Sequence, residues 1–78
     1  MKSDILIQFG KKVREKRTGL DLSQEELAER AGVHRTYIGM IERAEKNITL
    51  GNVEKICKAL QIPINQIFTF DKKNHGKR

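Results

Sequence analysis

The sequence has little of the residue types on which metal sites, disulfides and catalytic centres depend. It contains one cysteine and two histidines in 78 residues, so no internal disulfide can form and no Cys/His cluster has zinc-site spacing. It also lacks a nucleophile–base pair and a glycine-rich loop that could cradle a phosphate. The composition therefore argues against an enzyme and predicts a protein without a metal or cofactor.

Long apolar stretches are absent too. No run approaches the roughly 20 residues that a membrane-spanning helix needs, and residues 1–4 are not followed by the apolar core of a signal peptide. Together with the single cysteine, this predicts a reduced, cytoplasmic protein with no membrane partner. Cys57 follows the spacing of buried aliphatic residues, so we expect a small core side chain there rather than a reactive thiol.

Basic residues outnumber acidic ones by 16 to 10, which gives a net charge of +6. Four of the basic residues and one acid lie in residues 71–78, so half of the net charge belongs to this segment. We expect one small domain over residues 1–70 and a basic flexible tail over 71–78. A positive balance suits a polyanionic partner. Because the body carries only about half of the excess, the distribution of its charges matters more than their total.

Apolar residues recur at helical spacing, and no segment alternates as a strand would. The predicted fold is all-α, with five helices: 3–17, 24–31, 35–43, a fourth capped by Thr49, and a short fifth at 64–68 after Pro63.

The same spacing predicts which side chains form the core. Ile5, Phe9 and Val13 recur every four residues and are expected on the inward face of the first helix. Leu20 and Leu22 are expected to enter the core from the loop that follows.

Residues 24–43 carry the most informative pattern in the chain. Ser23 and Glu26 form a capping box at the start of a helix, Ala28 is small enough for a close helix crossing, and Gly32 supplies the positive φ of a tight turn. Inward-facing aliphatic residues then recur at helical spacing. Two short helices joined in this way are a helix-turn-helix, whose second helix enters a DNA groove.

The outer face of that second helix presents a set of residues suited to DNA: Arg35, Thr36, Gly39 and Arg43. Arg35 can donate to guanine O6 and N7, and Thr36 can contact a thymine methyl or a base edge. His34, where the helix begins, is expected to be a cap or a neighbour of a phosphate. An ordinary αα-hairpin with solvated arginines is the alternative that the motif does not exclude.

Several motifs carry a family resemblance: Val13-Arg14-x-x-Arg17, Leu22-Ser-Gln-Glu-Glu-Leu-Ala, Ala31-Gly-Val and Ile41-Glu-Arg. From about residue 9 to residue 68 the chain resembles the λ-repressor-like helix-turn-helix family. Arg35-Thr-Tyr-Ile-Gly-Met-Ile-Glu-Arg and Lys46-Asn-Ile-Thr-Leu further resemble the controller proteins of restriction–modification systems. Those proteins are dimeric transcription regulators that bind operators upstream of their own gene and of the endonuclease gene.

The resemblance implies a sequence-specific regulator that binds double-stranded DNA. A prophage-type repressor, an antitoxin and a helix-turn-helix module for protein interaction are the alternatives. The expected phosphate contacts are Ser23, Gln24, Tyr37, Arg43, Lys46 and Asn47. For Tyr37, a half-buried ring at the helix edge is an equal alternative.

In the family, the positions of Arg17 and Glu42 form an ion pair that joins the first helix to the recognition helix. The resemblance therefore implies a structural pair here, which sets the angle at which the recognition helix is presented. Ala44 departs from the family, because a glycine usually closes this helix. Alanine at positive φ costs about 1–2 kcal/mol, so we expect the helix to run on to Glu45.

The end of the domain is unusually apolar for so small a core, with Ile62, Ile64, Ile67, Phe68 and Phe70. We predict a dimerisation segment over 62–70, a two-fold dimer and a palindromic operator. The alternative is that all five side chains pack inside the monomer.

Glu25 and Glu29 lie one helical turn apart and are expected to share an exposed face beside the DNA. They resemble the acidic patch by which activating members of the family contact RNA polymerase. The alternative is a solvated, charged helix face.

Overall fold

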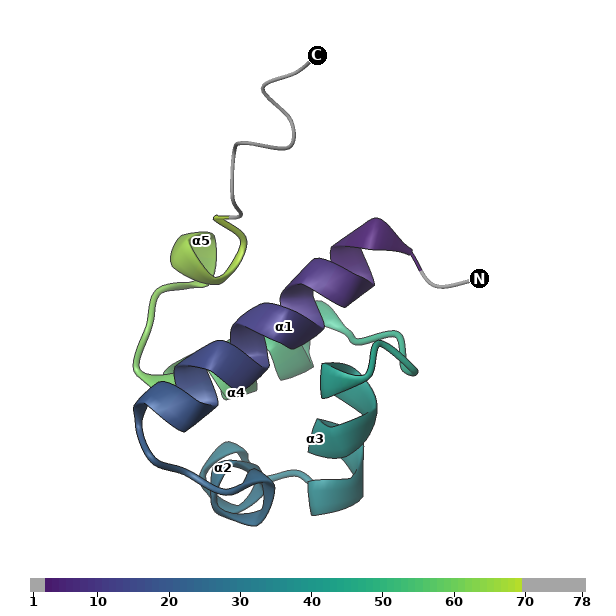
Figure 1. Ribbon diagram of the computed structural model, residues 1–78. Helices are drawn as coiled ribbons and strands as arrows, with labels where there is room; N and C mark the ends of the chain where they lie inside the picture. The colour runs from purple at the N-terminus through teal and green to yellow at the C-terminus, as the bar shows by residue number, and fades with distance from the viewer. Residues whose placement is uncertain (1–2, 70–78) are drawn as a thin grey trace.

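The computed structural model describes residues 3–69, which form five helices and no strand (Figure 1). The helices are α1 (Asp4–Gly19), α2 (Gln24–Ala31), α3 (Arg35–Glu42), α4 (Leu50–Leu60) and α5 (Ile64–Ile67). In Figure 1, α1 runs diagonally across the molecule, with α2 and α3 below it and α4 behind it. The predicted all-α fold with five helices is confirmed. Within the described residues, no helix has both the length and the apolar character needed to cross a membrane.

Four of the helices begin at a side chain that caps the backbone. Ser3, Ser23 and Thr49 each accept a hydrogen bond from an amide three residues later. At Ser23 the reciprocal bond is also present, because the backbone amide donates to Glu26 Oε1 at 2.8 Å. The predicted capping box and the predicted cap at Thr49 are therefore confirmed. His34 caps α3 through its imidazole.

The same four helices also end alike, in a Schellman motif. An amide bonds back to a carbonyl five residues earlier in the pairs Leu22–Arg17, Val33–Ala28, Glu45–Met40 and Ile62–Cys57. Each motif places one residue at positive φ: Asp21, Gly32, Ala44 and Gln61. Only one of these four is a glycine. Three helices therefore end on a conformation that their sequence does not favour.

The expectation that α3 runs on to Glu45 is wrong. The helix ends at Glu42, and Ala44 takes φ +59°. The strain is offset because the amides of Ala44 and Glu45 satisfy two of the last carbonyls of the helix. The methyl group of Ala44 is also buried, at 8 % exposure.

The core is one cluster of buried side chains contributed by all five helices: Phe9, Val13, Leu27, Ala28, Ala31, Ile38, Ile41, Val53, Ile56, Cys57, Ala59, Leu60 and Ile67. Cys57 lies inside it, and burial raises the pKa of its thiol. Leu22 is buried as expected, but Ile5 and Leu20 are 56 % and 41 % exposed. Those two expectations are wrong, because Ile5 lies at the overhanging first turn of α1 and Leu20 is the C-cap of the same helix.

Gly10 allows α1 to approach the end of α3 closely. A Cβ at this position would lie 2.5 Å from the carbonyl oxygen of Ile41 and 3.0 Å from that of Glu42. Such contacts are too short for any side chain, so backbone packs directly against backbone. This role was not evident from the sequence pattern. The available signal was a glycine inside an amphipathic helix, where it costs about 1 kcal/mol relative to alanine.

Candidate nucleic-acid interface

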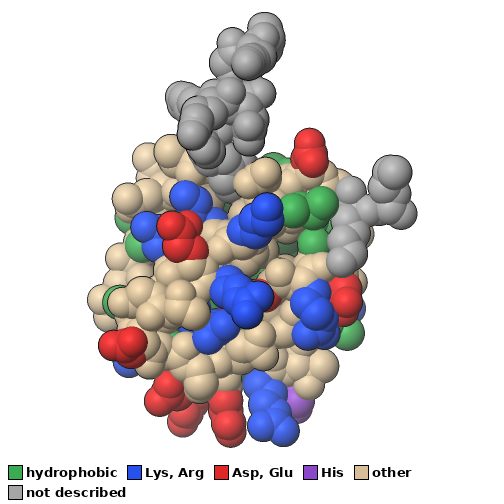
Figure 2. Space-filling model, in the orientation of Figure 1, with side chains coloured by type: hydrophobic (Ala, Val, Ile, Leu, Met, Phe, Trp, Pro, Cys, Tyr) green, Lys and Arg blue, Asp and Glu red, His purple; other side chains and the backbone are tan. Residues whose placement is uncertain are grey.

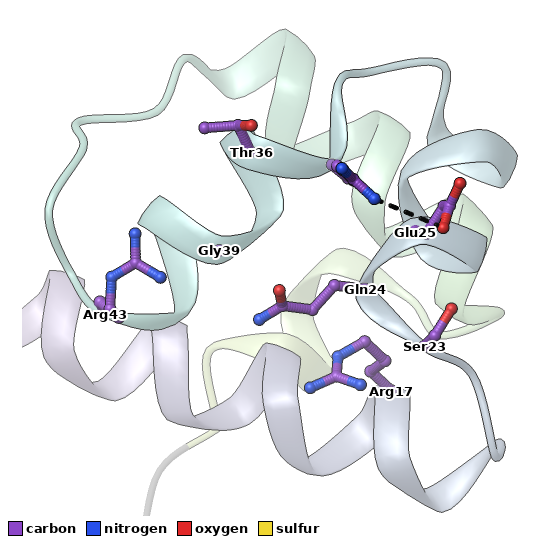
Figure 3. Close-up of a pocket in the computed structure, with 8 residues that line it drawn as sticks. Arg17, Ser23, Gln24, Glu25, Thr36, Gly39 and Arg43 are labelled. Carbon is purple, nitrogen blue, oxygen red and sulfur yellow. Dashed lines mark ion pairs between the residues drawn. The ribbon is translucent and has the colours of Figure 1, made fainter.

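Five of the predicted DNA-contacting residues surround one open hollow, shown close up in Figure 3. Its lining is Arg17, Ser23, Gln24, Glu25, Arg35, Thr36, Gly39 and Arg43. The turn between the two helices contains Gly32 at φ +74°, as the motif requires. The structure therefore places the two expected base contacts and three of the expected phosphate contacts on one surface.

Arg35 and Thr36 lie on the exposed first turn of α3. The side chain of Arg35 is 66 % exposed, and its Nη1 lies 3.7 Å from Oε1 of Glu25. Both partners of this ion pair face solvent, so it restrains the arginine only weakly. The guanidinium is therefore free to turn toward a base edge.

Arg17 and Glu42 form the ion pair that the family resemblance implied. Arg17 Nε donates to Glu42 Oε2 at 2.7 Å and Nη2 donates to Oε1 at 3.0 Å, with side chains only 11 % and 3 % exposed. The hydrogen bonds that Arg17 donates to Glu42 raise the pKa of Arg17 against the opposing effect of burial, and the negative charge of Glu42 adds to the rise. Arg17 Nη1 also donates to the Leu22 carbonyl at 2.8 Å. The pair thus ties α1 to α3 and to the loop before α2.

Gln24 extends this network to α2. Its Nε2 donates to Glu42 Oε1 at 3.1 Å, and its side chain is half-buried. Gly39, expected on the open outer face of α3, is covered by the side chains around it. A Cβ there would lie 3.1 Å from Arg43 Nη1 and 3.5 Å from Gln24 Oε1. The floor of the hollow is therefore formed by ordered polar side chains rather than by bare backbone.

Tyr37 turns toward α4 and away from the hollow. Its half-buried ring packs against the core, and its hydroxyl accepts a hydrogen bond from Asn52 Nδ2 at 3.0 Å. This is the half-buried arrangement weighed as the alternative, and a phosphate contact through the hydroxyl stays a prediction. The sequence carried no signal for Asn52. Lys46 and Asn47 are exposed in the loop between α3 and α4, apart from the residues that line the hollow.

The acidic residues of α2 lie beside this surface. Figure 2 shows acidic side chains gathered at the lower edge of the molecule over α2, with lysines and arginines across the middle of the same face. Glu25 and Glu29 are both exposed, as expected. Arg43, the C-cap of α3, forms an exposed ion pair with Glu45 at 3.1 Å.

The apolar C-terminal residues divide between the core and the surface. Ile67 is fully buried in the monomer, so the expectation that it contacts a second copy is wrong. Its side chain instead packs α5 against the core. Phe68 is half-buried, and its ring stacks on that of Phe9 in α1, with 5.5 Å between the ring centroids. Ile64 is 44 % exposed and Ile62 is half-buried. Phe70 and the predicted tail lie outside the described residues.

Comparison with known proteins identifies the architecture. Residues 13–67 match the model of the helix-turn-helix family. Over 71 residues the chain is 44 % identical to control protein C.BamHI of Bacillus amyloliquefaciens, covering 90 % of this chain and 88 % of that protein. It is likewise 44 % identical over 66 residues to control protein C.SmaI of Serratia marcescens, covering 85 % of this chain and 79 % of that protein.

Two solved structures are similar throughout the fold. The restriction–modification controller protein C.AhdI from Aeromonas hydrophila has a TM-score of 0.79 and 43 % identity, covering 81 % of this chain and 96 % of that one. C.Esp1396I bound to a 19 base pair DNA duplex has a TM-score of 0.79 and 32 % identity, covering 85 % and 88 %. The resemblance predicted from the motifs is confirmed. The chain therefore belongs to the helix-turn-helix family of DNA-binding transcription regulators, and the relatives that it matches include restriction–modification controller proteins.

Proposed function

We propose that this protein is the controller of a restriction–modification system and acts as a homodimer on a palindromic operator upstream of its own gene. The observation that carries the proposal is the arrangement of α3. Its first turn presents Arg35 and Thr36 to solvent, while its far end is fastened to α1 and α2 through the buried carboxylate of Glu42. Such a helix is presented rigidly, as base reading in the major groove requires. Its site of action is the cytoplasm, where a bacterial operator lies.

Base and phosphate contacts fall to different residues in this proposal. Arg35 reads a guanine and Thr36 reads a neighbouring base edge. The phosphate contacts come from the start of α2, from both ends of α3 and from the loop after it: Ser23, Gln24, Tyr37, Arg43, Lys46 and Asn47. One N–H of the Gln24 side-chain amide already donates to Glu42, so its second N–H is the donor left for a phosphate, directly or through a bridging water.

The second copy would be held by the part of the C-terminal segment that remains at the surface. Ile64 and the exposed edges of Ile62 and Phe68 are the described residues that support this. A two-fold dimer of a helix-turn-helix protein places two recognition helices about one helical turn of DNA apart, which matches a palindrome. Glu25 and Glu29 would then lie beside the DNA, where they can contact RNA polymerase and activate transcription.

Footprinting on the DNA upstream of its own gene, followed by titrations of the protected duplex, tests this function. If a dimer contacts roughly 6–10 phosphates, affinity should fall on the order of 10³–10⁵-fold between 50 and 200 mM salt. An affinity that barely moves over this range would contradict the phosphate contacts. Analytical ultracentrifugation of the complex should show two chains per duplex.

Two substitutions separate base reading from phosphate binding. Arg35→Ala should relax discrimination at one base pair in each half-site, at about 1–3 kcal/mol for a lost bidentate contact. Arg43→Ala should weaken the operator and a scrambled duplex alike. Lys58→Ala removes an exposed cation of α4 outside the hollow and serves as the control. Equal loss of specificity in both arginine variants would refute the division of roles.

A further inference from the structure

The recognition helix differs from the other capped helices in the chemistry of the side chain that begins it. Serine and threonine hydroxyls cap α1, α2 and α4, and they do not titrate near neutral pH. The cap of α3 is His34, whose Nδ1 accepts a hydrogen bond from the backbone amide of Thr36 at 3.0 Å. The helix that carries the proposed base contacts thus begins at a group that changes charge between pH 5 and pH 8 in many proteins.

The direction of this hydrogen bond determines the state of the imidazole. A backbone amide can only donate, so Nδ1 must hold its lone pair and the proton of the neutral ring must sit on Nε2. Protonation of Nδ1 removes the acceptor. It also places a positive charge at the positive end of the helix dipole, which is unfavourable. The first turn of α3 holds Arg35, Thr36 and Tyr37, so it contains no carboxylate that could replace the cap.

The charges around the imidazole come from α2 and α3. His34 shares a shallow surface depression with Glu25, Glu29 and Arg35. Within this depression, Arg35 and Glu25 face each other at 3.7 Å. All of these groups are exposed, so solvent screens their effects. The hydrogen bond from the backbone amide of Thr36 to Nδ1 is the contact that distinguishes the two protonation states geometrically.

We propose that His34 is a positioning residue for sequence readout and that only its neutral form acts. In that form it holds the first turn of α3, from which Arg35 and Thr36 reach the base edges. Protonation loosens this turn but leaves the phosphate-binding side chains of α2 and of the loop after α3 in place. Acidification therefore lowers the preference for the operator over unrelated DNA. The inference rests on the proposed base contacts of Arg35 and Thr36.

The measurement is the ratio of two affinities. Fluorescence anisotropy gives the Kd of the footprinted duplex and of a scrambled duplex of equal length, from about pH 5.5 to pH 8.5 at constant ionic strength. Attraction of a protonated His34 to phosphate acts on both duplexes and cancels in the ratio. Loss of an N-cap corresponds to about 5-fold per subunit, so the ratio for the proposed dimer should fall by about 25-fold on acidification. A His75→Gln background removes the other histidine of the chain.

Two variants at the same position separate capping from charge. His34→Asn retains a capping side chain that does not titrate, and its ratio should stay high at every pH. His34→Ala lacks the cap, and its ratio should be low and independent of pH. A constant ratio in the wild-type protein, or an equal fall in His34→Asn, overturns the proposal.

A DNA-free measurement keeps this test apart from the proposed function. In the 78-residue chain, ¹⁵N NMR of the imidazole should show the Nε2–H tautomer of His34 at high pH. The amide of Thr36 should shift and exchange faster as His34 titrates. A Thr36 amide that ignores this titration overturns the proposal, whether or not an operator is found. Absence of operator binding at every pH would instead refute the proposed function.

Discussion

Replacement of Arg17 by methionine gives a quantitative test of how the recognition helix is held. The Glu42 carboxylate is 3 % exposed and accepts two hydrogen bonds from Arg17 and one from Gln24. Arg17→Met preserves most of the side-chain length but leaves this buried charge with the single amide donor. Breaking a buried pair in this way costs about 3–5 kcal/mol, because the desolvation of the remaining charge is no longer offset. A chain of 78 residues has roughly 4–12 kcal/mol of stability in total, so the variant should be marginally folded.

Removal of both charges should restore most of that loss. The double variant Arg17→Met, Glu42→Met has no buried carboxylate, and such replacements are often neutral or stabilising. We expect its free energy of unfolding to lie within about 1 kcal/mol of the wild-type value. Any loss of operator affinity that persists in the double variant then measures the contribution of the pair to the orientation of α3.

Urea denaturation followed by circular dichroism provides the measurement. All variants are compared at one protein concentration, because association adds stability by mass action. Arg14→Met, at an exposed position of the same helix, is the matched control and should change stability by less than about 0.5 kcal/mol. A loss below about 1 kcal/mol in Arg17→Met would refute the reasoning, as would a double variant as unstable as the single one.

The pH dependence of this loss follows from the guanidinium. Hydrogen bonding to the Glu42 carboxylate raises the pKa of Arg17 above its ordinary value. A raised pKa contributes stability at every pH below the ordinary value, and that stability is lost only at strongly alkaline pH. Because the guanidinium stays charged throughout, the difference between wild type and Arg17→Met should not decrease as the pH rises from about pH 6 to pH 9. A difference that disappears on going from pH 6 to pH 9 would contradict the assignment.

Three further outcomes can be measured on purified variants. Gly10→Ala should lower the free energy of unfolding by about 1–3 kcal/mol because the new Cβ meets a carbonyl of α3. Gly51→Ala, whose new Cβ would make only an ordinary contact of 3.9 Å with Thr49 Oγ1, should raise it by up to about 1 kcal/mol; equal effects would contradict the close approach of α1 and α3. Gln61→Gly should stabilise by about 0.5–1 kcal/mol in the same urea assay, because glycine removes the strain of φ +62° at an exposed site; destabilisation would contradict this. The double variant Glu25→Gln, Glu29→Gln should keep its operator affinity and lose activation of transcription from its own promoter, and unchanged activation would leave these exposed residues as surface charge.

Local features of the fold could be predicted because they depend on residues close together in the chain. The capping box at Ser23 and the turn at Gly32 each involve neighbours within a few residues, and the structure shows both. The strained ends of the other helices could not be predicted in this way. The hydrogen bonds around Ala44 are local, but its burial, which helps to offset the strain of the positive φ, exists only once the helix has packed.

The sequence by itself determined the helices, the motif and the face of α3 that carries Arg35 and Thr36, because helical periodicity sorts side chains by face. It did not determine which apolar residues on the inward faces are covered by another helix. Ile5 continues the apolar stripe of α1 but extends past the core, whereas Ile67 fills the core instead of a dimer surface. Contacts between distant segments, such as Asn52 with Tyr37, likewise leave no local pattern. The tertiary structure decided these points, because burial depends on how helices are placed in space and not on spacing along any one of them.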